Sequence, residues 1–80
     1  MNITDEPTLL PIGADKIPLI QNLGPEPVFI ARSDVDMLDL GIKLNMGDAF
    51  ETANEVRQGG TTLYAVTASG TSDIRIITSG

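Results

Sequence analysis

Short apolar runs, separated by glycine or proline at roughly eight to twelve residue intervals, dominate the pattern along this chain. The clearest two runs cover residues 63–68 and 73–77, with a small polar segment, SGTS, between them. Two β-prone runs joined by such a segment predict a tight β-hairpin at the C-terminus. In residues 63–68 both faces of the strand are largely apolar, so we expect this strand to be central or to be covered on both sides.

The second run of this pair alternates between apolar and polar positions. Asp73 and Arg75 share one face with Ile77, while Ile74 and Ile76 share the other. The first face is therefore expected to be wetter, and to be a place where another protein could bind. The four side chains expected to hold the sheet together are Leu63, Val66, Ile74 and Ile76.

Upstream runs predict further short strands at residues 8–12, 17–23, 28–31, 42–44 and 49–52. Pro11 and Pro18 lack a backbone donor, which indicates an edge strand or a strand start at each position. The sequence GPEP at residues 24–27 predicts a rigid turn that joins its neighbouring strands into a hairpin. Residues 14–16 are expected to turn the chain, and residues 58–61 to break it.

Two segments fit the strand pattern less well. In residues 32–41, Ser33 and Asp34 follow Arg32 and suit the entry to a helical turn or an ordered loop, and Gly41 ends the segment. Residues 48–57 tolerate a helix, but Thr52 and the short length favour a strand at the beginning of this segment.

Together these patterns predict an all-β fold, namely a small antiparallel β-sandwich or barrel of about six to eight short strands with a C-terminal hairpin. The folded domain is expected to cover residues 8–80. Residues 1–7 are polar and acidic, and they predict a flexible N-terminal arm. The alternative is that this arm becomes ordered on a neighbouring subunit.

The composition of the chain excludes several kinds of site and disfavours one class of ligand. The 80 residues contain no cysteine and no histidine, which removes disulfides and the common zinc, copper and iron sites. Eleven acidic residues against five basic ones give a net charge of −6, which disfavours a nucleic-acid ligand. A domain of this size has a thin core, so self-assembly or docking onto a larger body is expected.

No apolar run is long enough to cross a bilayer, and the N-terminal residues show no secretory signal pattern. The chain is accordingly expected to be made in the cytoplasm, to be soluble, and to bind no membrane.

Catalytic groups are scarce. The serines lack the imidazole base that activates most serine nucleophiles, and the carboxylate pair Asp48 and Glu51 would need a substrate cleft that a domain of this size has little room for. We therefore expect no enzyme.

The acidic segment that holds Asp34, Asp36 and Asp39 invites a calcium hypothesis, because hard cations bind carboxylates. Its spacing departs from that of the EF-hand loop, since the third carboxylate falls at position 6, and a solvated loop is favoured. No metal and no cofactor are expected. Of the aromatic residues, Phe29 and Phe50 are assigned to the core, whereas Tyr64 suits either the core or an interface.

Three stretches carry a resemblance to a known group of proteins. They are IQNLGPEPVFIARSDV at residues 20–35, GIKLNMGDAFE at residues 41–51, and LYAVTASGTSDIRIITSG at residues 63–80. In this order they resemble small β-domain virion structural proteins of tailed bacteriophages, over residues 17–77. The resemblance implies a capsid decoration or head-associated protein that binds the outside of the head lattice and stabilises it. A tail- or fibre-associated module, or one that binds carbohydrate on the host surface, is the alternative.

The partners implied are the major capsid protein and copies of this chain, with a trimer at local three-fold positions. The acidic charge disfavours a place beside packaged DNA, so the outer surface of the head is the expected location. The residues predicted to contact a partner come from the N-terminal arm and the polar strand faces. They are Ile3, Glu6, Arg32, Tyr64, Asp73 and Arg75.

Overall fold

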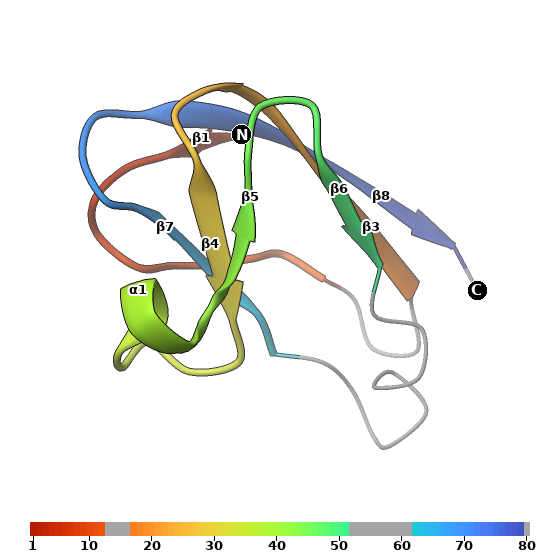
Figure 1. Cartoon of the computed structure of the whole chain (residues 1–80). Helices are drawn as coiled ribbons and strands as arrows, with labels where there is room; N and C mark the ends of the chain where they lie inside the picture. The colour runs from red at the N-terminus through yellow and green to blue at the C-terminus, as the bar shows by residue number, and fades with distance from the viewer. Residues whose placement is uncertain (13–16, 52–61, 80) are drawn as a thin grey trace.

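The computed structural model describes residues 1–12, 17–51 and 62–79, so the turns expected at 14–16 and 58–61 lie outside the described residues (Figure 1). Within them the chain forms eight strands and one helix. The strands are β1 (Asn2–Ile3), β2 (Thr8–Leu9), β3 (Ile17–Pro25), β4 (Val28–Ala31), β5 (Ile42–Leu44), β6 (Ala49–Glu51), β7 (Tyr64–Thr67) and β8 (Ser72–Ser79). The helix is α1 (Met37–Leu40).

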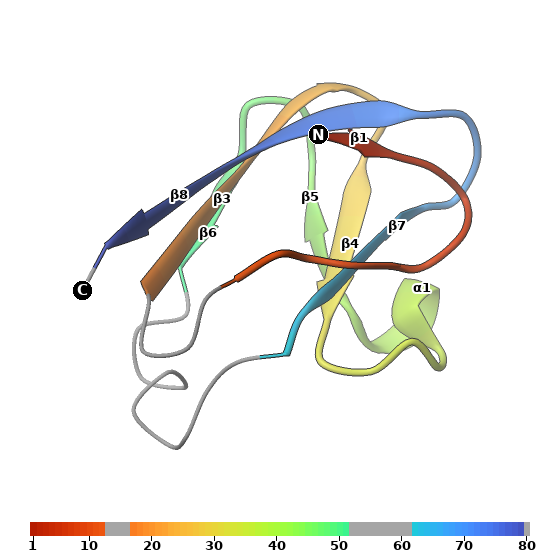
Figure 2. The same ribbon diagram turned by 180° about the vertical axis from the view of Figure 1, so that it is seen from behind.

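The strands make two antiparallel sheets of four, which confirms the predicted all-β sandwich. Sheet A has the order β1-β8-β3-β6, and sheet B has the order β2-β7-β4-β5. The two orders correspond strand by strand, because β1 continues into β2, β3 into β4, β5 into β6 and β7 into β8. The fold is therefore built from four long antiparallel segments, each of which passes from one sheet to the other (Figures 1 and 2).

This topology corrects both predicted hairpins. β7 pairs with β2 and β4, whereas β8 pairs with β1 and β3, so the two C-terminal strands lie in different sheets. β3 and β4 are likewise in different sheets. The physical reason is the core, since placing the two C-terminal strands in separate layers buries Ala65 and Ile74 in one shared cluster. The short turn 68–71 then serves as a corner, and Thr67 Oγ1 donates a 2.8 Å hydrogen bond to Gly70 O across it.

The C-terminal residues nevertheless occupy the centre of the fold. β7 is flanked on both sides in sheet B, and β8 is flanked on both sides in sheet A. Residues 63–67 are buried or half-buried on both faces, as the sequence predicted. The expected alternation along β8 is also confirmed, because Ile74 is buried while Asp73 and Arg75 are exposed.

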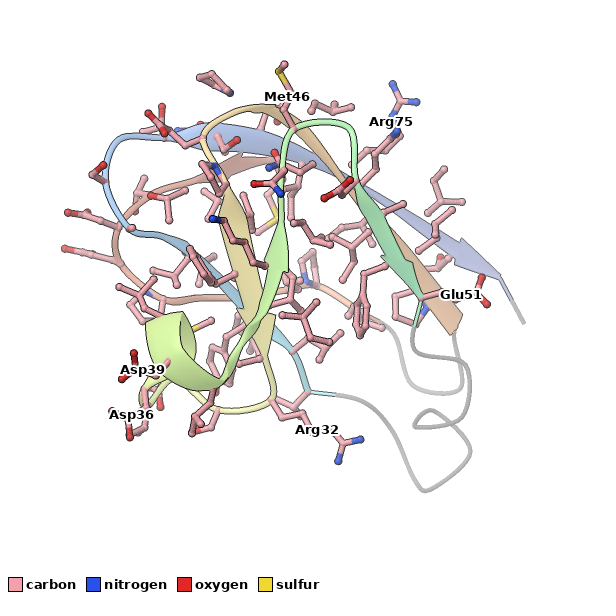
Figure 3. The ribbon with its side chains drawn as sticks, in the orientation of Figure 1. Arg32, Asp36, Asp39, Met46, Glu51 and Arg75 are labelled. Carbon is pink, nitrogen blue, oxygen red and sulfur yellow. The ribbon has the colours of Figure 1, made fainter. Side chains whose placement is uncertain are left out.

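Side chains from the inner faces of both sheets fill the space between them (Figure 3). These positions alternate along each strand with outward-facing ones, as a two-layer sandwich requires. The buried members of the core cluster are Ile3, Leu10, Ile20, Val28, Ile30, Leu44, Leu63, Ala65 and Ile74.

The N-terminus belongs to this core, which corrects the predicted flexible arm. Asn2 and Ile3 form β1 and pair with Asp73 and Ser72 of β8, and the Ile3 side chain is fully buried. The physical reason is that β1 covers the open edge of β8 and adds an apolar side chain to a thin core. The folded domain thus begins with the first strand and not at residue 8.

Two further expectations can be compared with the strands. Pro11 follows β2, which is an edge strand of sheet B, and Pro18 is the second residue of β3, so both prolines stand where the sequence placed them. The helical alternative for residues 48–57 is wrong over its described part, because Ala49–Glu51 pair with β3. Strand pairing there outweighs a weak helix propensity.

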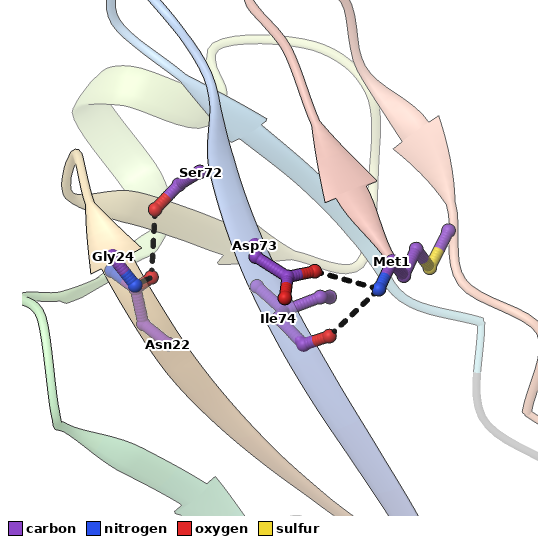
Figure 4. A network of polar contacts seen from close by, with 6 residues as sticks. All are labelled: Met1, Asn22, Gly24, Ser72, Asp73 and Ile74. Atoms are coloured by element: carbon purple, nitrogen blue, oxygen red, sulfur yellow. Dashed lines mark hydrogen bonds and ion pairs between the residues drawn. The ribbon is translucent and has the colours of Figure 1, made fainter.

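A buried amide locks the corners at which the chain changes sheet. Asn22 has no exposed surface, and its Nδ2 donates 2.8 Å hydrogen bonds to Glu26 O and to Leu44 O. Its Oδ1 accepts hydrogen bonds of 2.8 Å from Gly24 N and from Ser72 Oγ (Figure 4). The Ser72 hydroxyl also lies 2.7 Å from Glu26 O, an alternative acceptor for its single proton. One side chain in β3 therefore ties together the corners that follow β3, β5 and β7.

Candidate functional site

Residues 32–41 lie against the outer face of sheet B, and Met37 anchors them there. Both Met37 and Val66, on the outer face of β7, are only 4% exposed. Gly41 donates a 2.9 Å hydrogen bond from its N–H to Met37 O. A Cβ at this glycine would collide with the carbonyl oxygen of Met37 and would lie 3.1 Å from the carbonyl oxygen of Ile30 in β4, so the tight end of α1 favours glycine.

This anchored segment turns several large apolar side chains toward solvent. Val35 is 62% exposed, Leu38 50%, Leu40 78% and Ile42 46%. Single exposed apolar side chains are normal on protein surfaces, but four within eight residues are a local concentration of the kind that marks an interaction surface. Val35, Leu40 and Ile42 line one depression together, while Leu38 lines a second one. We call these four residues the apolar ridge.

Two depressions flank the apolar ridge. The first, the apolar groove, has a volume of about 300 Å³ and is lined by Val35, Leu40 and Ile42, with Phe50 and Leu63 among its other walls. The second, the acidic groove, has a volume of about 490 Å³ and borders Leu38 on the other side of the segment. Its lining contains four carboxylates, those of Asp5, Asp34, Asp36 and Asp39.

A separate polar surface lies on the outer face of β8. The N-terminal ammonium of Met1 donates to Asp73 Oδ1 at 2.8 Å and to Ile74 O at 3.0 Å (Figure 4). The hydrogen bond from this ammonium is the largest of the influences that hold the pKa of Asp73 below its usual value, and the charges of the ammonium and of Arg75 act in the same direction. Asp73 and Arg75 also line one shallow depression together with Leu23.

Because the pKa of Asp73 is lowered, the stability that this carboxyl group contributes is expected to fall as the pH is lowered. A carboxyl group with a depressed folded-state pKa adds stability above its unfolded-state pKa and loses that contribution as the pH falls through the folded-state value. We therefore expect Asp73→Asn to lower the urea midpoint slightly at pH 7 and to leave it unchanged in strong acid, where the wild-type carboxyl group is protonated. Urea unfolding of both proteins across the acid range measures this difference.

Asp39→Asn is the matched control, because Asp39 is exposed and forms no ion pair within the described part of the chain. A midpoint difference for Asp73→Asn that persists in strong acid, or that Asp39→Asn reproduces, would contradict the role given to the ammonium.

The six residues predicted to contact a partner do not form one surface. Ile3 lies in the core, which corrects its assignment to an interface, because a fully buried side chain cannot meet a partner. Glu6 is exposed between β1 and β2, and Tyr64 is half-buried on the outer face of sheet B. Arg32 and Arg75 lie at opposite ends of the molecule (Figure 3). Asp73 and Arg75 are brought together as neighbours on one face of β8.

The apolar ridge was not among the predicted contact residues. Its sequence signal is the presence of Val35, Leu38 and Leu40 among aspartates in the least strand-like part of the chain. Such residues match neither the strand period nor a long helix, so their spacing alone does not say whether they are buried.

The acidic residues form no metal site where the structure describes them. No group of three or more potential ligand side chains is close enough to hold a metal ion in residues 1–12, 17–51 and 62–79. Asp48, one of the two carboxylates considered for catalysis, accepts a 2.9 Å hydrogen bond from Asn45 N and so stabilises the turn before β6. In the same residues no helix has the length and apolarity needed to cross a membrane.

Comparisons of this chain with protein families, with curated proteins and with solved structures found no match.

Proposed function

We propose that this protein is a non-enzymatic structural protein of a phage virion, which binds the outside of the head lattice and stabilises it. The observation that carries the proposal is the apolar ridge, a patch of large aliphatic side chains held toward solvent on a well-anchored segment. The resemblance of residues 17–77 to small virion β-domains supplies the identity of the particle.

Burial of the apolar ridge gives a physical account of adhesion. Fully burying one leucine, isoleucine or valine side chain stabilises a complex by about 1.5 to 3 kcal/mol. A surface that exists only in the assembled shell would bind the ridge there and not on free subunits. Because a ligand that binds only the assembled state shifts the equilibrium toward it, such binding stabilises the shell by mass action.

The charge of the chain supports the outer surface of the head. With eleven acidic residues and five basic ones, the protein has little to offer phosphate groups and would be repelled by packaged DNA. The carbohydrate-binding alternative needs exposed aromatic faces. Phe29, Phe50 and Tyr64 are each partly buried, so no observation favours that alternative.

The proposal is tested on virions of phages that encode this chain. Purified particles are separated into heads and tails, and mass spectrometry is expected to find the protein with the heads. Heads prepared without it, when mixed with purified protein, should take it up to saturation and should then dissociate at a higher temperature. Recovery of the chain only with tails, or failure to sediment with heads, would overturn the proposal.

A further inference from the structure

From the two grooves and the ridge between them, we infer that residues 33–42 dock onto a partner surface that is both apolar and basic, with an apolar side chain of the partner in the apolar groove and its lysine or arginine side chains against the acidic groove. The inference rests on the proposed function only for the partner's identity, which would then be the capsid protein. The docking surface is assigned from the structure of this chain.

The ridge is held in place before any partner binds. Asp36 adopts a left-handed backbone conformation with φ of 56°, which aspartate tolerates better than most residues. Its carbonyl oxygen accepts hydrogen bonds from Asp39 N at 3.1 Å and Leu40 N at 2.9 Å. Together with the buried Met37 side chain, these bonds fix the direction of the exposed leucines. Little conformational entropy is then lost on binding, which favours affinity.

The apolar groove suits the anchor of a partner. Its exposed rim is made by Val35, Leu40 and Ile42, and its volume of about 300 Å³ can accept a large side chain. A side chain seated there would remove water from three aliphatic groups at once. Interfaces concentrate their binding energy in such buried central contacts.

The acidic groove sets the charge of the partner. Asp5, Asp34, Asp36 and Asp39 lie around it, and none of them forms an ion pair within the described part of the chain. A second copy of this chain would be a poor occupant, because a two-fold contact through this face would place the same carboxylates near one another on chains that each carry a net charge of −6. A basic partner has the complementary charge.

The outer face of β8 is less suited to this role. Asp73 is already paired with the N-terminal ammonium, and Ile77 is the only residue of β8 among the exposed large apolar side chains of the described chain. Ile77 is 50% exposed, as Leu38 is, so it offers a matched control for substitutions in the ridge.

The surface is tested with a synthetic peptide in which two leucines are flanked by lysines, and with a second peptide that has glutamate in place of each lysine. In an NMR titration of the full chain, the basic peptide should shift the signals of residues 33–42, more weakly as salt is added, and the acidic peptide should not. The double substitution Leu38→Ser and Leu40→Ser should weaken binding at least about tenfold. Ile77→Ser should leave binding unchanged.

Charge is tested separately with the triple substitution Asp34→Asn, Asp36→Asn and Asp39→Asn, which keeps side-chain size and keeps a residue that tolerates the φ of position 36. It should weaken binding of the basic peptide and remove most of the salt dependence. The inference fails if the basic peptide does not bind, if it shifts β8 instead, or if Ile77→Ser weakens binding as much as the double leucine variant. Concentration-dependent dimers in sedimentation that the leucine substitutions abolish would also overturn it, in favour of a second copy.

Binding of variants to purified heads distinguishes this inference from the proposed function. The double leucine variant should lose uptake by heads while Arg75→Glu keeps it. If both variants bind heads as the wild type does, the inference fails and the proposed function stands. If the wild type binds the basic peptide through residues 33–42 but not heads, the proposed function fails and the docking surface stands.

Discussion

Replacing Asn22 with alanine is expected to lower the free energy of unfolding by about 3 kcal/mol or more, because each buried polar group left without a partner costs about 1 to 3 kcal/mol. The substitution leaves the carbonyl oxygen of Leu44 without its side-chain donor and the N–H of Gly24 without its acceptor, while the carbonyl oxygen of Glu26 keeps only the Ser72 hydroxyl as a side-chain donor. A domain of 80 residues has a total stability of about 4 to 12 kcal/mol, so this loss is a large fraction of the whole.

The urea midpoint, followed by circular dichroism, measures this effect. Asn45→Ala is the matched control, since Asn45 is an exposed asparagine in the neighbouring turn. Ser72→Ala removes one donor to Asn22 Oδ1 and should have a smaller effect, which keeps the test informative if the Asn22 variant does not fold. A urea midpoint for Asn22→Ala equal to that of Asn45→Ala would contradict the role of Asn22 in stabilising the corners between the sheets.

Replacing Ile3 with alanine is expected to cost about 2 to 5 kcal/mol, the range observed when a buried isoleucine or leucine is truncated. Ile3 is fully buried in the core cluster although it is the third residue of the chain. A flexible arm, in contrast, would lose almost nothing. The comparison therefore decides between an ordered first strand and the arm that the sequence predicted.

Leu9→Ala is the control for this experiment. Leu9 lies in β2, the next strand along the chain, and its side chain is 57% exposed. We expect its truncation to shift the urea midpoint much less than that of Ile3. Equal and small shifts for both variants would show that the N-terminal residues contribute nothing to the fold in solution.

The sequence predicted the fold class because burial follows local alternation. Ile74 and Arg75 fall on opposite faces of β8 as their pattern indicates, and Pro11 follows an edge strand. The local pattern of apolar and polar residues could not predict which strands pair with one another. Segments such as SGTS and GPEP have a composition that suits a hairpin turn and a corner between two sheets equally well. The contacts that decide between the two are distant in sequence, because Asn22 bonds to Leu44 and to Ser72.

The candidate site was predictable only in part. Asp73 and Arg75 were placed correctly on an exposed strand face, because a period of two specifies a face. Ile3 was assigned to a mobile segment because one apolar residue among polar ones is a weak signal, and its partner Ser72 is distant in sequence. Leu38 and Leu40 gave no indication of exposure, since it depends on how Met37 and Gly41 fix the segment on sheet B.

The most direct test of the whole account is a cryo-EM reconstruction of a virion that incorporates this protein. We expect density for the sandwich on the outer surface of the head, with residues 33–42 against the shell, a basic capsid surface beside Asp34 and Asp36, and the outer face of β8 turned away. Density on the tail or inside the shell would contradict the proposed function, and density with β8 against the shell would contradict the assigned docking surface.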